Sequence, residues 1–117
     1  MSSNIKQTLL HDGKIIVLEL KGNYVGGDET DELRDEIRKI ADLGNIKLVL
    51  DLGGVSYLNS SALGVLIAAH ANYVKRGGQI KLCQLNKNLE NIFVITKLSL
   101  IFDSYPNQME AVAGFTE

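Results

Sequence analysis

The sequence predicts an α/β fold, in which four helices cover a mixed, mostly parallel sheet of about five strands. Two observations carry this prediction. Short apolar, β-branched runs alternate along the chain with longer segments whose apolar residues recur at helical spacing. Glycine or asparagine stands at most of the junctions between these segments. The expected order is β-β-α-β-α-β-α-β-α, with mostly parallel strands after an opening hairpin.

Residues 4–22 predict the opening hairpin. Its turn is expected at His11-Asp12-Gly13, because Asp and Gly both tolerate the positive φ angles of a tight turn. The second strand, Ile15–Leu20, is nearly continuous in apolar residues, as an interior strand should be. His11 is therefore expected to be an exposed turn residue.

Residues 28–44 predict the first helix, after the glycine-rich break at 22–27. Asp28 is a plausible N-cap, and further acidic residues crowd the first turn, where the helix dipole favours them. Gly44 should end the helix. One face carries the apolar residues Leu33, Ile37, Ile40 and Ala41.

A buried strand over Ile46–Leu52 and a second helix over 60–78 follow. The helix should end at Gly77-Gly78, after two basic residues that complement its dipole. His70 lies within the apolar stripe and is interpreted as a partly buried packing residue. The predicted inward stripe consists of Leu63, Leu66, Ile67, His70 and Val74.

The last third of the chain predicts a strand at 79–85, a short helix at 86–98, a strand at 99–105 and a closing helix at 107–115. The short helix could be capped by either Asn86 or Asn88. Its inward residues are expected to be Leu89, Ile92 and Phe93.

Composition narrows the range of functions. A chain of 117 residues fits one domain, and a net charge of −2 with scattered basic residues argues against general nucleic-acid binding. No apolar run approaches the ~20 residues needed to cross a bilayer. Cys83 is the only cysteine, so it forms no intramolecular disulfide and is expected to be a buried apolar residue. This cysteine usage, without a signal peptide, predicts a cytoplasmic location.

Conventional catalytic motifs are missing from the sequence. It contains no nucleophile elbow, phosphate-binding loop, His-Glu-x-x-His or dinucleotide fingerprint. Two histidines and one cysteine cannot supply a zinc site, and ten helical residues would separate Ser60 from His70 by about 15 Å. The sequence therefore predicts neither an enzyme nor a bound metal or cofactor, and points to proteins or small molecules as partners.

Residues 58–64, Leu-Asn-Ser-Ser-Ala-Leu-Gly, follow a predicted strand and begin the second helix. Loops at the carboxyl ends of parallel strands are where ligands gather in open α/β sheets. Either Asn59 or Ser60 could cap the helix, but capping explains only one of these polar side chains. A phosphate on Ser60 would be tolerated at the positive end of the helix dipole, while it would change the surface that a partner meets.

Residues 49–85 strongly resemble the core of bacterial anti-sigma factor antagonists, the single-domain branch of the STAS fold. The pattern is a strand ending in Asp-Leu, a short loop, a Ser-Ser-x-Leu-Gly block, a helix, Gly-Gly and a further strand. The opening hairpin and residues 88–112 also fit in order and length, so the resemblance implies one STAS domain over 1–117.

The resemblance implies a protein-binding switch. In this family the unphosphorylated antagonist binds an anti-sigma factor that is also a serine kinase, and so frees a sigma factor. The kinase uses ATP and magnesium to phosphorylate the first serine of the pair, here Ser60, and the complex dissociates until a phosphatase resets it. The nucleotide belongs to the kinase, so no cofactor is implied for this chain.

The resemblance also implies a partner-binding surface around Ser60. Gly64 is expected to allow close approach between the helix and other backbone. The surface would comprise Gly26, Gly27, Asp28, Asn59, Ser60, Ser61, Leu63 and Gly64.

The chain departs from the family pattern at several positions. Asn59 replaces the usual Asp before the serines, Ala62 replaces a frequent Gly after them, and Gly53 stands where a serine follows Asp-Leu. The Asp of the family's Gly-x-Leu-Asp is replaced, or displaced to Asp28.

Two other functions stay open at the level of sequence. One is a constitutive STAS scaffold in a transporter or sensory complex, in which Ser60 serves only as a helix cap. The other is a small-molecule or nucleotide sensor that uses the glycine-rich segment 22–29.

Overall fold

The computed structural model describes residues 4–116 as a five-stranded sheet with helices on both faces. The strands are β1 (Ile5–Leu10), β2 (Ile15–Tyr24), β3 (Lys47–Leu58), β4 (Gln79–Cys83) and β5 (Ser104–Tyr105). The helices are α1 (Asp28–Asp42), α2 (Ser60–Lys75), α3 (Lys87–Ile95) and α4 (Gln108–Thr116), with a 3₁₀ turn, η1 (Leu98–Leu100). The predicted order of strands and α-helices is confirmed, and η1 is an addition.

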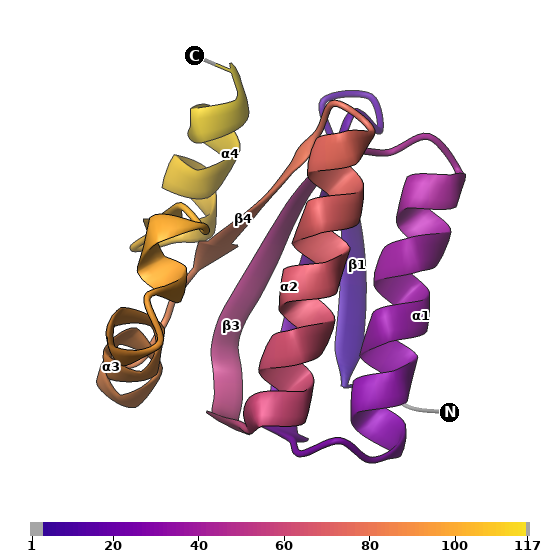
Figure 1. The fold of residues 1–117 in the computed structure, drawn as a ribbon. Coiled ribbons are helices and arrows are strands. Elements are labelled where there is room, and N and C mark those ends of the chain that lie inside the picture. Colours follow the sequence, from indigo (N-terminus) through magenta and orange to yellow (C-terminus); the bar gives the residue numbers. More distant parts are fainter. Residues whose placement is uncertain (1–3, 117) are drawn as a thin grey trace.

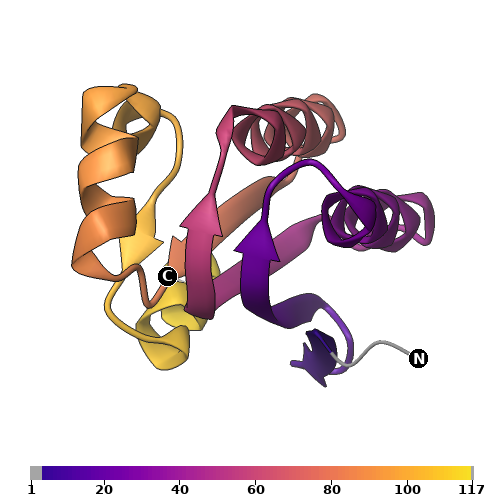
Figure 2. The same cartoon turned by 90° about the horizontal axis from the view of Figure 1, so that it is seen from below.

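The sheet is mixed, as predicted. Its strands lie in the order β1-β2-β3-β4-β5; β1 pairs antiparallel with β2, and the remaining pairs are parallel. Helices α1 and α2 lie side by side on one face of the sheet, and α4 lies on the other (Figures 1 and 2). Both α1 and α2 begin at the edge where the parallel strands β2 and β3 end, which sets up the site described below.

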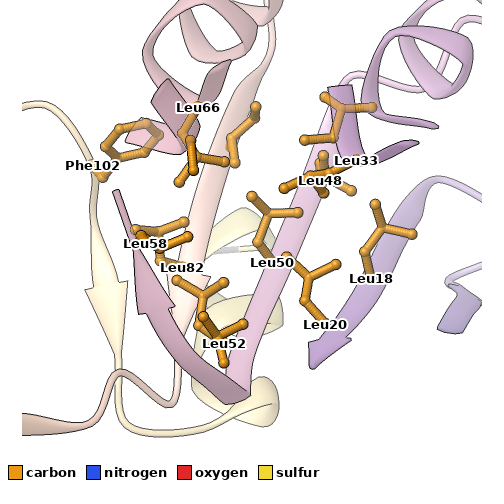
Figure 3. Packing of buried hydrophobic residues seen from close by; sticks show 14 of the residues in the cluster. Leu18, Leu20, Leu33, Leu48, Leu50, Leu52, Leu58, Leu66, Leu82 and Phe102 are labelled. Carbon is orange, nitrogen blue, oxygen red and sulfur yellow. The ribbon is translucent and has the colours of Figure 1, made fainter. Parts of the chain in front are cut away.

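The larger apolar core fills the space between the sheet and the helices α1, α2 and α3. Figure 3 shows Leu18, Leu50 and Leu66 among the side chains that fill this space from two strands and one helix, and each is fully buried. A smaller cluster under α4 contains Val17, Cys83 and other buried residues. Cys83 is fully buried, which confirms the prediction for this side chain.

The hairpin and α1 follow the sequence closely, except at the helix start. His11, Asp12 and Gly13 all have positive φ, as the predicted turn requires, and His11 is exposed. Asp28 was predicted as the N-cap, but the N-cap is Gly27 and no side chain caps the helix. Asp28 is instead the first helical residue, where its charge still lies near the positive end of the dipole.

The inward face of α2 differs from the predicted stripe. Leu63, Leu66 and His70 are buried, but Ile67 and Val74 are 41% and 53% exposed. Each of these two directly follows a buried residue and therefore points about 100° away from it. Tyr73 takes the inward position, and its hydroxyl donates a hydrogen bond of 2.7 Å to the carbonyl oxygen of Ile37. The phenol thus ties α2 to α1.

Strand lengths also differ from the predictions. β2 extends to Tyr24 and β3 to Leu58, because the two strands keep pairing through register shifts at the glycine-rich segments. Only Ser104 and Tyr105 of the predicted strand 99–105 pair with β4, and the preceding turn is η1. Asn86 rather than Asn88 caps α3. No helix within residues 4–116 has the length and apolar character needed to cross a membrane.

Candidate functional site

The candidate site lies where β2 and β3 end and α2 begins. Tyr24 and Leu58 are register partners at the ends of the two strands. The backbone N–H of Asn59 donates a hydrogen bond of 3.0 Å to the carbonyl oxygen of Tyr24. This bond fixes the start of α2 against the loop that leads from β2 into α1. Figure 1 shows both helices starting at this end of the sheet.

Asn59 is the N-cap of α2, which settles the choice between Asn59 and Ser60. Its side-chain oxygen accepts a hydrogen bond of 3.0 Å from the backbone N–H of Ala62, and its carbonyl oxygen accepts one of 2.9 Å from the N–H of Leu63. Ser60 is the first helical residue and is exposed, and the first turn carries no acidic side chain. The Ser60 hydroxyl is therefore not needed to cap the helix.

Gly26 brings the β2–α1 loop against the start of α2. It has a φ of +88°, and a Cβ at this position would lie 3.2 Å from the Cβ of Ser61. Its N–H donates a hydrogen bond of 2.9 Å to the hydroxyl oxygen of Thr30, which holds the loop to the first turn of α1. The structure therefore brings Gly26, Asn59 and Ser61 together, and Gly27 and Asp28 follow as exposed residues.

Two of the predicted surface residues have other surroundings. Leu63 is only 8% exposed and belongs to the core. The prediction that Gly64 permits a close backbone approach is wrong, because no other part of residues 4–116 would lie within 4 Å of a Cβ at this position. Close approaches occur instead at Gly54, where a Cβ would lie 2.7 Å from that of Lys21 on the neighbouring strand, and at Gly78, where a Cβ would clash with the carbonyl of Ile46.

The phenol of Tyr24 lies buried beneath the site. Burial, reinforced by the charges of Glu32 and Glu29, raises the pKa of Tyr24 to about 12. Its hydroxyl has no hydrogen-bond partner among residues 4–116. The phenol therefore stays neutral at physiological pH and offers no acid–base chemistry to the site.

His70 is a packing residue, as predicted. Its ring lies 4.7 Å, centroid to centroid, from that of Phe102, and the residue is 8% exposed. Burial lowers the pKa of His70, and the opposing charge of Asp103 reverses this only in part. Within residues 4–116, no three His, Cys, Asp or Glu side chains gather into a set that could hold a metal ion.

A groove between α1 and α2 begins beside this site, and the sequence analysis missed it. The groove has a volume of about 570 Å³, and Ser61 is one of the residues that line it. Apolar periodicity marks the core-facing stripe of each helix, whereas the groove is lined largely by other faces of the helices. The available signals were two arginines four residues apart in α1 and small residues at the same spacing in α2. The lining includes Arg34, Arg38, Gly64, Ala68, Asn72 and Arg76.

Comparison with known proteins adds the family context. The family model described as STAS domain matches residues 6–111. A Bordetella bronchiseptica protein named as a candidate anti-sigma factor antagonist is 29% identical over 104 residues, covering 89% of this chain and 88% of its own length. The anti-sigma-B factor antagonist of Bacillus subtilis is 37% identical over 71 residues, covering 61% of this chain and 64% of its own.

Solved structures share the fold at low sequence identity. The crystal structure of a candidate anti-sigma factor antagonist from Thermotoga maritima superposes with a TM-score of 0.87 at 18% identity, covering 97% of this chain and 95% of that one. The Bacillus cell fate determinant SpoIIAA, in its phosphorylated form, gives a TM-score of 0.74 at 14% identity, covering 95% and 98%. At these identities the likeness establishes the fold alone.

Proposed function

The chain belongs to the STAS domain family, and from this premise we propose that it is an anti-sigma factor antagonist controlled by phosphorylation of Ser60. Relatives along most of its length carry the antagonist name. In the proposed cycle, the unmodified chain binds an anti-sigma factor with serine kinase activity and so releases a sigma factor in the cytoplasm. The chain is a substrate of that kinase and catalyses nothing itself.

One observation carries the phosphorylation proposal: Ser60 is exposed, and it is Asn59 rather than Ser60 whose side chain caps the helix. A phosphate on Ser60 would leave the capping hydrogen bond in place. It would add about 1.5 to 2 negative charges at a helix end that carries about half a positive charge, and no acidic side chain in the first turn opposes it. The fold should therefore tolerate the modification.

The same charge should act strongly on a bound partner. A partner that covers the start of α2 would have to strip water from the phosphate dianion, or its own charges would be repelled by it. Either effect costs several kcal/mol of binding free energy. Each 1.4 kcal/mol changes a dissociation constant tenfold. Phosphorylation is therefore expected to release the kinase, and a phosphoserine phosphatase would restore binding. The proposed contact surface is Gly26, Gly27, Asp28, Asn59 and Ser61 around Ser60.

Charge mimicry at position 60 tests this function. Ser60→Asp should bind the anti-sigma factor much more weakly than the parent does, while the free energy of unfolding changes by less than about 0.5 kcal/mol. Ser60→Ala should bind normally and gain no phosphate, which intact mass measures after incubation with the kinase and ATP. Ser99→Asp, at an exposed position on η1, controls for added charge.

Equal binding by Ser60→Asp and the parent would contradict the switch. If protein isolated from its own host also never carried a phosphate, the constitutive scaffold would be the better description.

A further inference from the structure

We propose that the groove between α1 and α2 is the docking site for an acidic amphipathic helix of the anti-sigma factor. The inference rests on the proposed function, because it assigns a surface and a chemistry to that same partner. It adds a recognition element along the length of the two helices, away from the reacting hydroxyl.

The shape of the groove suits a helix. Its lining runs from Ser61 to Arg76, and fifteen residues of helix correspond to about 22 Å. That length exceeds most small ligands and matches about four helical turns. Figure 1 shows α1 and α2 running alongside each other.

The floor of the groove is low enough for a helix to approach closely. Gly64, Ala68 and Ala69 supply only small side chains to it. A Cβ at Gly64 would have no neighbour within 4 Å in the described part of the chain, so this position is open. The separation of packed helices is set by the side chains at their contact, and small residues permit the shorter distances.

The charge of the lining selects an acidic occupant. Three arginines line the groove with a single carboxylate, Asp42, although the chain as a whole has a net charge of −2. Arg76 pairs with Asp42 at 2.8 Å, and Arg34 contacts Asp31 at 3.2 Å. Arg38 has no ion pair with any residue of the described range 4–116. A carboxylate from outside the chain would supply the missing counter-charge.

The position of the groove connects this surface with the switch. Ser61 lies on the lining, directly after the proposed phosphoacceptor Ser60. A helix in the groove would hold the rest of the kinase near that hydroxyl. Because the occupant is acidic, a phosphate at the end of the groove would repel it. The same electrostatics that favours docking before phosphorylation therefore favours release afterwards.

Paired variants on the two helices test the groove. Each serine-kinase anti-sigma factor encoded by the source genome is purified and titrated calorimetrically against the parent chain, and the one that binds is the probe. Arg38→Glu should weaken its binding at least about tenfold, whereas Lys39→Glu, its neighbour outside the groove, should change it less than about twofold. Ala68→Gln should weaken binding similarly, whereas Ala71→Gln, exposed on α2 but outside the groove, should not.

The salt dependence of binding provides a further test, because the loss of affinity caused by Arg38→Glu should be smaller at high ionic strength. Thermal melting of each variant by circular dichroism establishes that it folds. If the probe binds Arg38→Glu or Ala68→Gln as tightly as the matched control, the groove proposal is overturned and the switch at Ser60 stands. If no kinase binds or phosphorylates the parent, the proposed function fails and the docking site fails with it.

Discussion

The side chain of Asn59 holds the first turn of α2 through its 3.0 Å bond from the Ala62 N–H. Asn59→Ala removes the only side-chain acceptor capping that turn in the described residues, so the free energy of unfolding should fall by about 1 kcal/mol. Asn59→Asp keeps the acceptor and adds a charge that the helix dipole favours, and should stabilise by about 0.3 to 1 kcal/mol. Urea denaturation measures both changes.

Asn88→Ala is the control for this pair, because Asn88 is exposed inside α3 and caps nothing. Its effect should stay within about 0.5 kcal/mol. An Asn59→Ala protein as stable as the parent would show that the cap contributes nothing.

The imidazole of His70 makes stability depend on pH. Burial holds its pKa in the folded chain below the ordinary value of 6.5. As the pH falls below about 6.5, the unfolded chain binds a proton that the folded chain does not, so the free energy of unfolding should decrease until the lower, folded pKa is passed. Urea titrations at pH values of about 7.5 and 5.5 should show this loss in the parent and a smaller one in His70→Gln.

The exposed His11 provides the comparison for His70. Its φ of 52° is one that asparagine also tolerates, so His11→Asn should fold like the parent and serves as a matched histidine substitution outside the core. An identical pH dependence in His70→Gln and the parent would mean that other groups cause it.

At the scale of elements, two glycines near the site should respond oppositely to alanine. Gly26→Ala puts a Cβ at a φ of +88° and 3.2 Å from the Cβ of Ser61, so it should destabilise the fold by about 1 kcal/mol or more. Gly64→Ala lies in the helix with open space around it and should stabilise by about 0.5 to 1 kcal/mol. Thermal and urea unfolding measure both, and the same sign of change in the two variants would contradict this assignment.

Sequence patterns predict where the helices and strands lie along the chain better than they predict which side of each one is buried. The ends of α2 could be predicted to within three residues, because Asn59 or Ser60 and the Gly77-Gly78 pair mark them locally, although the helix ends at Lys75 rather than at 78. Its buried face could not, because Val74 and its neighbour Tyr73 are both reasonable inward residues, and only packing against α1 selects Tyr73 through its bond to Ile37. The strand predicted at 99–105 failed for a similar reason: apolar Leu100 is 82% exposed, and only Ser104 and Tyr105 meet β4.

The candidate site likewise has parts that the sequence predicts and parts that it does not. The Ser-Ser block is local, so its position at the start of a helix could be predicted from sequence. The contact between Gly26 and Ser61 joins the β2–α1 loop to a helix distant from it in sequence, and it depends on β2 and β3 ending together. The groove between α1 and α2 required the relative placement of two helices, which no periodicity within either one records.

At the scale of the whole molecule, Cys83 reports whether the sheet and α4 stay together. It is fully buried, and burial, followed by the charges of Asp51 and Glu19, raises the pKa of its thiol to about 12. Alkylation by iodoacetamide should therefore be more than about a hundredfold slower in the native protein than in denaturant. Mass spectrometry over time measures the rate, and rapid labelling of the native chain would reveal local opening beneath α4.

The division of roles between residues 59 and 60 has an evolutionary consequence. Because the side chain of Asn59 caps the helix, the residue at position 60 can change while the protein still folds. Under the proposed switch, a protein with alanine at position 60 would stay permanently bound to the anti-sigma factor, and one with glutamate there would stay permanently unbound. A single substitution after gene duplication could thus produce paralogues that phosphorylation no longer regulates and that set a fixed level of sigma-factor release.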